Sequence, residues 1–316
     1  MNISVVIPNF NGKNLLRKNI EKVLHVFDAY KKGYVEIIIT DDASQDGSVD
    51  FIKEYIQKNS LNVSIQLLEN ASGKNKGFST NVNKGVARAT GDIVILLNTD
   101  VVPHADFLDP LIMHFKDDNV FAVGCMDESI ESGKTVLRGR GVGKWRRGFL
   151  IHGPGKLDKT STLWVGGGSG AFKKEIWDKL GGLNELYNPF YWEDIDISYR
   201  AQKAGHIVLF EKESVVQHEH ETGSIKKNYK PSSIKKIAYR NQFYFTWLNA
   251  TDRMILLSHI VFLPLFLLKA LLKKDIEFIS GFFMAVRNIA RVMRERKDIQ
   301  KLVKKSDKEI IESVSL

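Results

Sequence analysis

The 316-residue sequence contains a single cysteine, Cys125, and seven prolines. One cysteine cannot form an internal disulfide, and no other residue pattern indicates a zinc site, so disulfide-stabilised and zinc-finger classes are excluded. Cys125 ends the apolar run Phe121-Ala122-Val123-Gly124-Cys125. We therefore expect it to be a buried small apolar residue rather than a reactive thiol.

Several signatures are also missing. Residues 3–8 form a strand-like run at the very start, without the basic, apolar and small-residue pattern of a signal peptide, so we expect a cytoplasmic protein. No Gly-X-Gly-X-X-Gly motif follows this run, which argues against a nicotinamide-dependent oxidoreductase, and the glycines at 166–170 lack the Lys-Ser/Thr of a phosphate-binding P-loop. There is no nucleic-acid motif, so we expect no nucleic-acid partner.

Charge is distributed unevenly along the chain. Residues 1–225 carry 27 Lys and Arg against 29 Asp and Glu, whereas residues 226–316 carry 19 against 8. The basic segment also holds the apolar run 254–268, which is interrupted by His259 and Pro264 and falls short of the roughly 20 apolar residues of a spanning helix. We predict an interfacial helix on an anionic membrane surface, in preference to a spanning helix or a buried core helix.

The first half of the chain alternates β-branched runs with helical patterns. The expected strands are 3–8, 34–41, 63–69, 92–99 and 120–125, and the expected helices are 14–31, 46–58, 77–89 and 105–117. Such alternation predicts an α/β fold with a mostly parallel central sheet covered on both faces. Residues 126–172 predict loops and short strands, with 138–148 either a mobile basic loop near a phosphate or a surface hairpin. Helices at 173–180 and 192–204 and a strand at 207–217 follow.

Acidic residues stand at the ends of two expected strands. Asp41 and Asp42 follow the run 37–40, and Asp100 follows the run 93–97 after Asn98-Thr99. The carboxyl ends of parallel strands open onto the crevice where α/β sheets bind ligands. A carboxylate there could bond a nucleobase or ribose, or hold a divalent cation that bridges a diphosphate. Each could also cap the next helix or a turn.

A third acidic group, Glu193, Asp194 and Asp196, stands at the start of the expected helix 192–204. The helix dipole favours acids in a first turn, so a stabilising role is one explanation. The other is that Asp194 is a general base for an acceptor hydroxyl. His218 and His220 follow the strand 207–217, and a neutral imidazole nitrogen of either could complete a metal shell.

The order of these motifs is more specific than any one of them. In chain order they are Pro8-Asn9-Phe10-Asn11-Gly12, Asp41-Asp42-Ala43-Ser44, residues 75–85, Asn98-Thr99-Asp100, residues 181–185 and residues 190–200. The series resembles family 2 glycosyltransferases of the GT-A fold, especially the rhamnosyltransferase-like branch. The resemblance implies a GT-A catalytic domain at 1–225, and residues 226–316 then form a helical, membrane-associating extension.

The resemblance also implies roles position by position. The positions it places at the donor nucleotide are Pro8, Asn9, Asn11, Asp41, Asp42, Lys76, Gly77, Asn81, Asn98 and Thr99. Asp100 would bind Mg²⁺ or Mn²⁺, and His218 or His220 would reach the metal or the diphosphate. Asp194 would be the catalytic base, with Glu193 close to the acceptor. Asn98 replaces the first acid of the Asp-X-Asp motif, which would weaken metal affinity.

The implied activity is an inverting, metal-dependent transfer from a UDP- or dTDP-linked sugar to a hydroxyl of a glycan or lipid-linked acceptor. The expected setting is surface polysaccharide biosynthesis at the inner face of the cell membrane. A nucleotidyltransferase is an alternative, but it needs a glycine-rich basic loop after the first strand, which the chain lacks. A non-catalytic nucleotide-sugar-binding protein at the membrane is another, and Asp41, Asp100 and Asp194 argue against it.

Overall fold

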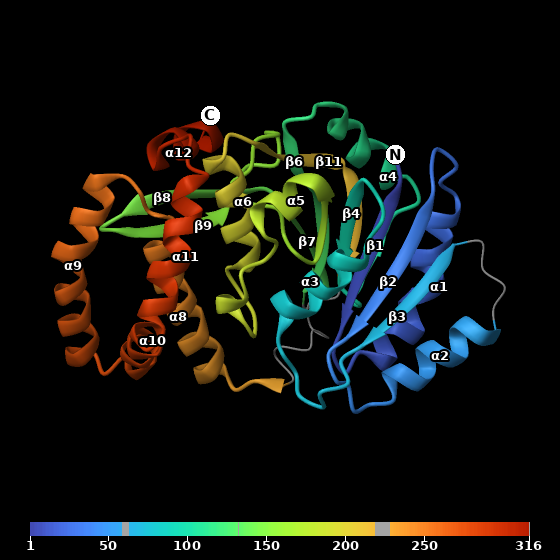
Figure 1. The fold of residues 1–316 in the computed structure, drawn as a ribbon, viewed down its shortest axis with the longest axis horizontal. Coiled ribbons are helices and arrows are strands. Elements are labelled where there is room, and N and C mark those ends of the chain that lie inside the picture. Colours follow the sequence, from blue (N-terminus) through green and yellow to red (C-terminus); the bar gives the residue numbers. More distant parts are fainter. Residues whose placement is uncertain (59–62, 132, 219–227, 316) are drawn as a thin grey trace.

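The computed structural model describes residues 1–58, 63–131, 133–218 and 228–315. Within these residues nine strands form one sheet in the order β3-β2-β1-β4-β10-β6-β11-β5, with β7 paired to β6 (Figure 1). The strands are β1 (Ile3–Asn9), β2 (Val35–Asp41), β3 (Ser64–Glu69), β4 (Ile93–Leu97), β5 (Val101–Pro103), β6 (Val120–Glu131), β7 (Lys134–Arg138), β10 (Ser169–Lys173) and β11 (Ile207–His218).

Most strands of the sheet run in one direction. β1 pairs in parallel with β2 and β4, β2 with β3, and β6 with β11. β10 lies antiparallel between β4 and β6, so β6 and β11 share the direction of the first four strands. This confirms the predicted α/β fold with a mostly parallel sheet. The antiparallel β10 lies in the region where short strands were expected, but the sequence patterns did not reveal its position or its direction.

Helices cover both faces of the sheet because its strands are apolar on both sides. Val5 and Ile7 pack under α1 (Lys13–Asp28), α2 (Ser48–Lys58) and α4 (Leu108–Ile112), which the 3-10 turn η1 (Met113–Lys116) extends. The intervening Val6 packs on the opposite face, under α3 (Phe78–Arg88), α5 (Lys174–Leu180) and α6 (Glu193–Lys203). This alternation follows the two-residue period of a strand. Cys125 is buried in the first of these cores, as predicted.

The C-terminal helices share a third core with the end of the preceding α/β half. They are α8 (Pro231–Asn249), α9 (Arg253–Leu272), α10 (Ile276–Val286), α11 (Ile289–Lys301) and α12 (Asp307–Ser315). This core joins Phe149 of the hairpin β8 (Gly141–Arg146)–β9 (Phe149–Pro154) with Tyr199 of α6 and Phe243 of α8. Of the two alternatives for the basic segment 138–148, the structure supports the hairpin, because this segment forms β8 and the turn into β9. Lys144, Arg146 and Arg147 are exposed, whereas Arg140 is buried and donates to the carbonyl of Val314 in α12. The predicted boundary at 225 lies outside the described residues.

A buried ion pair ties the last helix to α6. Lys203 Nζ lies 2.6 Å from Asp307 Oδ1, and both side chains are inaccessible to solvent. Tyr199 donates to the same oxygen at 2.6 Å, and the backbone N–H of Thr251 donates to Asp307 Oδ2 at 2.7 Å. Breaking a buried pair leaves an uncompensated charge. The C-terminal segment is thus part of the framework that holds α6.

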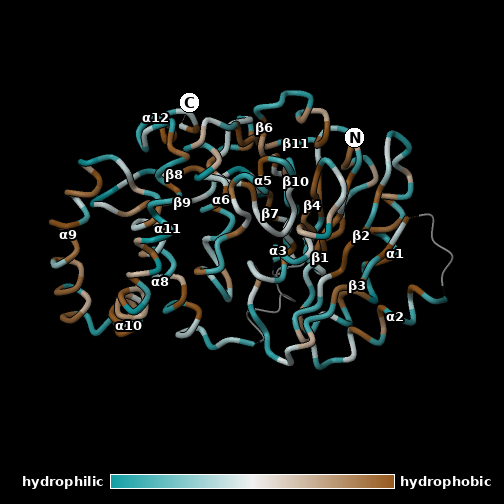
Figure 2. The backbone as a smooth tube through the Cα atoms, in the orientation of Figure 1, coloured by the Kyte–Doolittle hydropathy of each residue, from teal (hydrophilic) through white to brown (hydrophobic). Residues whose placement is uncertain are grey.

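One helix within the described residues, α9, is long and apolar enough to cross a membrane. Figure 2 shows it as a largely hydrophobic segment at one edge of the molecule. Only His259 and Ala270 of its 20 residues are buried, so α9 is not a buried core helix. Its exposed apolar side chains are Met254, Leu257, Ile260, Val261, Leu265, Leu268, Leu271 and Leu272.

Candidate active site

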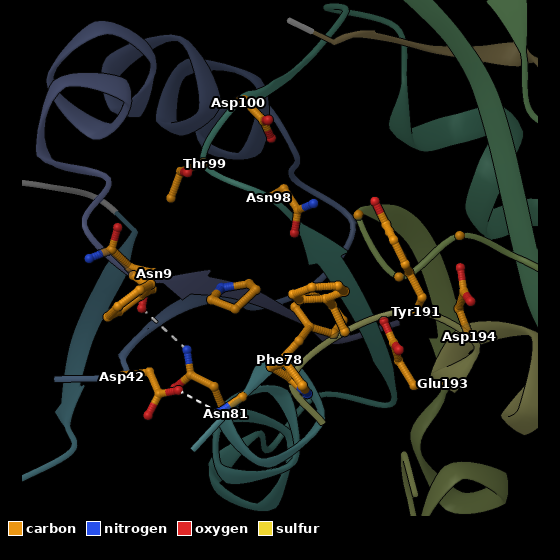
Figure 3. A pocket seen from close by; sticks show the side chains of 18 of the residues that line it. Asn9, Asp42, Phe78, Asn81, Asn98, Thr99, Asp100, Tyr191, Glu193 and Asp194 are labelled. Carbon is orange, nitrogen blue, oxygen red and sulfur yellow. Dashed lines mark hydrogen bonds between the residues drawn. The ribbon is translucent and has the colours of Figure 1, made fainter. Parts of the chain in front are cut away.

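A cavity of about 480 Å³ opens at the carboxyl ends of β1 and β4 and at the start of α3 and α6. Figure 3 shows Asn9, Asp42 and Asn81 on one side, Glu193 and Asp194 on the other, and Asn98 and Phe78 between them. The predicted site residues that line it are Pro8, Asn9, Asp42, Gly77, Asn81, Asn98, Thr99, Asp100, Glu193, Asp194 and His218.

Asn9, at the end of β1, lines the cavity. Its side-chain nitrogen donates to Asp41 Oδ2 at 2.7 Å, which orients the amide. Its Oδ1 is buried without a partner among the described residues. This oxygen lies close to Gly12, where an added Cβ would be 2.4 Å from it, so the amide ties the end of β1 to the loop that enters α1.

Asp41 and Asp42 have different surroundings although they are adjacent. Asp41 does not line the cavity, because its carboxylate accepts from Asn9 and from the N–H of Ser44 at 2.9 Å. Asp42 lines the cavity and accepts from the N–H groups of Lys76 and Gly77, each at 2.9 Å. Asp42 therefore holds the loop that enters α3 and does not cap α2.

Two other predicted donor residues lie outside the cavity wall. Asn11 Oδ1 accepts from the N–H of Gln45 at 2.8 Å. Lys76 contributes its backbone N–H to Asp42, and its side chain is not part of the wall. Asn81, on the first turns of α3, lines the wall and donates to the carbonyl of Thr40 at 3.0 Å, which ties α3 to the end of β2.

Asp100, His218 and Asp127 form a connected group at the sheet. His218 Nε2 lies 3.5 Å from Asp100 Oδ1, and His218 Nδ1 lies 2.8 Å from Asp127 Oδ2. Burial by itself lowers the pKa of His218, but the contacts with both carboxylates outweigh it and raise that pKa to about 9. His220, the other predicted histidine, lies outside the described residues.

The donor set at Asp100 fits a hard divalent cation. Mg²⁺ is held by one or two protein carboxylates together with phosphate oxygens, so a preformed protein cage is not required. Within the described residues, no group of three or more His, Cys, Asp and Glu encloses a metal position. Asp100 is buried and lines the cavity beside Thr99 and Asn98, where a nucleotide diphosphate could supply the remaining ligands.

The three acids of α6 separate into two kinds. Glu193 and Asp194 line the cavity, and burial raises the pKa of each, with the Asp194 charge a second cause at Glu193. Asp196 points elsewhere: its carboxylate pairs with Arg200 at 2.7 Å and accepts from Tyr187 and Asn249. The helix dipole alone does not account for Glu193 and Asp194, since both have raised rather than lowered pKa values.

The turn before α6 is strained. Tyr191 and Trp192 have φ of +73° and +78°, in the left-handed region that bulky residues avoid. The loop is also fixed to α3, because Pro189 and Asn188 accept from the N–H groups of Phe78 and Ser79, each at 3.0 Å. Strain of this kind persists where the surroundings over-determine it, and it directs Glu193 and Asp194 into the cavity.

Glycines let the β10 loop approach the site. A Cβ at Gly168 would lie 2.7 Å from Asn98 Nδ2, and a Cβ at Gly167 would lie 3.1 Å from the Phe78 ring. The glycine-rich segment makes two close approaches: residues 166–169 line the cavity, and Gly170 pairs with β4 and β6.

Sequence reasoning did not identify several lining residues, namely Asp127, Phe190, Tyr191 and Tyr229. For Asp127 a signal existed: it follows the apolar run 120–125, as Asp100 follows 93–97. The aromatic residues carried no comparable signal. Phe190 and Tyr229 lie far apart in the chain, and their rings meet at 4.8 Å only in the fold.

Comparison with solved structures supports a GT-A-like glycosyltransferase fold. GalNAc-T7 with UDP, GalNAc and Mn²⁺ aligns with a TM-score of 0.62 and 18% identity, covering 80% of this chain and 48% of that chain. S. aureus TarS 1–349 in complex with UDP-GlcNAc aligns with a TM-score of 0.59 and 13% identity, covering 99% of this chain and 90% of that chain. At these identities the likeness concerns the fold alone.

The sequence itself also has relatives. The chain is 26% identical over 211 residues to the probable glycosyltransferase YdaM of Bacillus subtilis, covering 66% of this chain and 48% of that protein. It spans about half or less of the length of the curated relatives it matches. Residues 4–180 match the family model described as Glycosyl transferase family 2. The chain therefore belongs to glycosyl transferase family 2.

Proposed function

We propose that this glycosyltransferase is an inverting, metal-dependent enzyme that moves a hexosyl or rhamnosyl residue from a UDP- or dTDP-linked donor to a hydroxyl of a glycan or lipid-linked acceptor. The observation that carries the proposal is the cavity whose wall brings Asp100 and Asp194 together with Asn9 and Asp42. Asn98 in place of an acid supports the rhamnosyltransferase-like branch. We place the reaction in surface polysaccharide biosynthesis.

The residues of the cavity divide the work of transfer. Asn9 and Asp42 line the part of the cavity that takes the donor nucleotide, and Asp42 also holds the loop that enters α3. As the acceptor oxygen bonds to the anomeric carbon, the bond from that carbon to the diphosphate breaks. Asp194 takes the proton of the acceptor hydroxyl. A single displacement inverts the configuration and needs no covalent enzyme nucleophile.

The charges of the wall support metal dependence. Among the described lining residues five are carboxylates and none is Lys or Arg, so a donor diphosphate finds no side-chain cation except His218. Asp100 would hold Mg²⁺ or Mn²⁺, with His218 as a further ligand only once its imidazole has lost the proton, and such an ion neutralises charge on the leaving diphosphate. The Mn²⁺ bound with UDP in the GalNAc-T7 structure supports this assignment.

The C-terminal helices support a peripheral position on the inner face of the cell membrane. The outer side of α9 exposes apolar residues, and Lys269, Lys273 and Lys274 stand near its end. An apolar surface with adjacent cations binds the interface of an anionic bilayer. We propose that α9 lies in this interface.

Transfer from defined donors tests the function. The full chain is incubated with a panel of UDP- and dTDP-sugars and Mn²⁺, and binding is followed by thermal shift because ligands that bind the folded state raise its melting temperature. Proton NMR of the product then gives the anomeric configuration. Inversion is expected. Retention would refute the single displacement, and binding without turnover would instead support the non-catalytic sugar-binding protein.

A further inference from the structure

One buried histidine fixes the long apolar helix α9 to the rest of the protein. His259 is only 5% exposed and bonds to both the turn of the β8–β9 hairpin and α8, and Figure 1 shows the tip of this hairpin reaching α9. Of the 20 residues of α9, only His259 and Ala270 are buried. The helix therefore has a small attachment surface, in which His259 is the buried polar residue.

Both ring nitrogens of His259 are hydrogen-bonded, and the two partners fix its protonation. Trp247 Nε1 lies 3.0 Å from His259 Nε2, and the carbonyl oxygen of Gly148 lies 3.1 Å from His259 Nδ1. An indole nitrogen only donates and a carbonyl only accepts, so Nε2 is the acceptor and Nδ1 carries the hydrogen. His259 is therefore neutral while α9 is docked. A second proton, on Nε2, would set two N–H groups against each other and break the bond to Trp247.

The surroundings of the ring also disfavour a charge. Phe149 lies edge-on to His259 with ring centroids 4.8 Å apart. A Cβ at Gly148 would lie 2.2 Å from the Cα of His259, so the hairpin turn fits closely against the helix. Burial lowers the pKa of His259 below its ordinary 6.5 and outweighs the opposite effect of the Gly148 carbonyl.

Charged side chains on the elements around His259 oppose its protonation as well. Those of the hairpin, α8 and α9 are all cations, namely Lys144, Arg146, Arg147, Lys235, Lys236, Arg240, Arg253 and Lys269. The acids at the start of α10, Asp275 and Glu277, pair with Lys235 at 3.1 and 3.8 Å. Asp252, before α9, accepts from the N–H of Asp307 at 3.2 Å. His152, the other histidine of the hairpin, stacks on the rings of Trp164 and Trp192 instead.

We propose that the hydrogen bond between Trp247 and His259 is a protonation-sensitive latch that keeps α9 on the rest of the protein, and that acidification releases the helix. Release uncovers the partly buried Leu263 and Phe266 in addition to the outer apolar side chains, so the detached helix is apolar on all sides. A helix that is apolar all round is suited to deeper burial in a bilayer. The latch is independent of the transfer chemistry, because His259 lies outside the cavity wall.

Protonation should weaken the docking of α9 over a defined pH range. Below about pH 6.5 a released His259 takes up a proton that the docked ring refuses, so the ratio of docked to released helix falls with decreasing pH. The fall should reach about tenfold per pH unit and should stop at the lowered pKa of the docked ring.

Hydrogen exchange followed by mass spectrometry measures this ratio in the full chain. A detached helix loses protection, because isolated helices are marginal in water. Peptides from α9 are compared from about pH 7.5 to about pH 5, after correction for the intrinsic pH dependence of exchange. Peptides from α1 report global unfolding and should keep their protection.

His259→Gln is the decisive variant, since glutamine can accept from Trp247 but does not titrate. We expect α9 to lose protection on acidification in the wild type and to keep it in His259→Gln. His25→Gln, at an exposed position on α1, is the control and should behave like the wild type. A wild-type α9 that keeps its protection throughout, or an equally steep loss in His259→Gln, would overturn the latch.

NMR of ¹⁵N-labelled histidines gives a second reading that does not depend on how glutamine packs. The signal of His259 is identified by its shift in Trp247→Phe. In the wild type we expect its hydrogen on Nδ1 and a titration below pH 6.5. A hydrogen on Nε2, or a pKa above 6.5, would contradict the latch.

Discussion

The side-chain nitrogen of Asn241, on α8, lies 2.8 Å from the carbonyl oxygen of Tyr191, two residues before Glu193. The same nitrogen lies 2.9 Å from the carbonyls of Tyr187 and Phe190. Asn241 is fully buried, so water cannot replace these bonds. A residue of the C-terminal segment thereby holds the left-handed turn that directs the acids of α6.

Replacing Asn241 should therefore affect both stability and turnover. Asn241→Ala leaves buried carbonyls without a donor, and we expect roughly 2–4 kcal/mol less unfolding free energy. Because the turn at Tyr191 relaxes, kcat should fall more than the donor KM rises. Urea unfolding and steady-state kinetics measure the two effects.

Gln242→Ala is the control for Asn241. Gln242 is its half-buried neighbour on the same helix and makes only one long contact, 3.5 Å from the carbonyl of Leu150. It should change stability by less than about 1 kcal/mol and leave kcat unaltered. If Asn241→Ala and Gln242→Ala lost the same stability and neither changed kcat, the hydrogen bonds of Asn241 would not be what fixes the turn.

Asp194→Asn should retain the fold and donor binding but lose roughly 10²–10⁴-fold in transfer rate, since an amide cannot act as a base. The wild-type rate should also depend on pH. Burial raises the pKa of Asp194 above its ordinary 3.8, so the active carboxylate is lost as pH falls through this raised pKa. The pH profile of kcat/KM should show an acidic limb above pH 3.8, and near-normal turnover by Asp194→Asn would reject the assignment.

Glu193 should make folding less stable as pH rises. In the unfolded chain it ionises near 4.5, whereas in the folded protein its raised pKa keeps the proton longer. Between these two values the unfolded state has released a proton that the folded state retains, so unfolding free energy falls with increasing pH. The side chain of Gln at position 193 does not titrate. The unfolding free energy of Glu193→Gln relative to wild type should therefore increase as the pH rises above 4.5.

Urea melts at several pH values measure this difference for Glu193. The exposed Glu185→Gln serves as the control and should run parallel to the wild type at every pH. A Glu193→Gln curve that also ran parallel to wild type would show that Glu193 is already ionised in the folded protein.

Asp100→Asn should remove the effect of metal on nucleotide binding. In the wild type we expect Mn²⁺ to tighten UDP binding measured by calorimetry, and in Asp100→Asn we expect affinities with and without Mn²⁺ to converge. Asp127→Asn leaves the carboxylate of Asp100 in place but replaces the charged partner of His218 Nδ1 with a neutral amide, so metal affinity should fall by about 10–100-fold. Asp106→Asn, at an exposed position, is the control. If it lost the effect of Mn²⁺ on UDP affinity as fully as Asp100→Asn does, a specific metal site at Asp100 would be contradicted.

The elements of the first half could be predicted because their apolar runs have clear periods. β10 could not, because residues 169–173 are short and follow glycines, and the strand exists only through pairing with β4 and β6. A Cβ at Gly170 would lie 2.2 Å from the Val165 side chain, so the close packing of Val165 requires glycine at position 170. Such constraints are tertiary and leave no periodic signal.

The site was predictable to the level of strand ends, not of individual side chains. Asp41 and Asp42 are neighbours, and successive side chains along an extended segment point to opposite sides. The family resemblance placed both Asp41 and Asp42 at the donor nucleotide, whereas of the two only Asp42 lines the cavity. The Glu193 and Tyr191 positions depend further on Asn241, about 50 residues away in the chain.

Membrane binding should depend on the outer face of α9. Deleting residues 251–316 would not test this, because it removes Asp307, the partner of the buried Lys203. Point changes at exposed positions avoid the problem: Leu257→Asp, Ile260→Asp and Leu268→Asp replace side chains that are 54%, 68% and 54% exposed.

The wild type should sediment with phosphatidylglycerol vesicles and less with phosphatidylcholine vesicles. The triple Asp variant should lose at least about hundredfold in partitioning, since each buried Leu or Ile contributes about 1.5–3 kcal/mol. Met113→Asp and Leu137→Asp, at exposed apolar sites outside the C-terminal segment, should bind like wild type. Loss of binding in these controls but not in the triple variant would place the membrane contact elsewhere. Release of the wild type by high salt, which screens the flanking lysines, would favour an interfacial over a spanning helix.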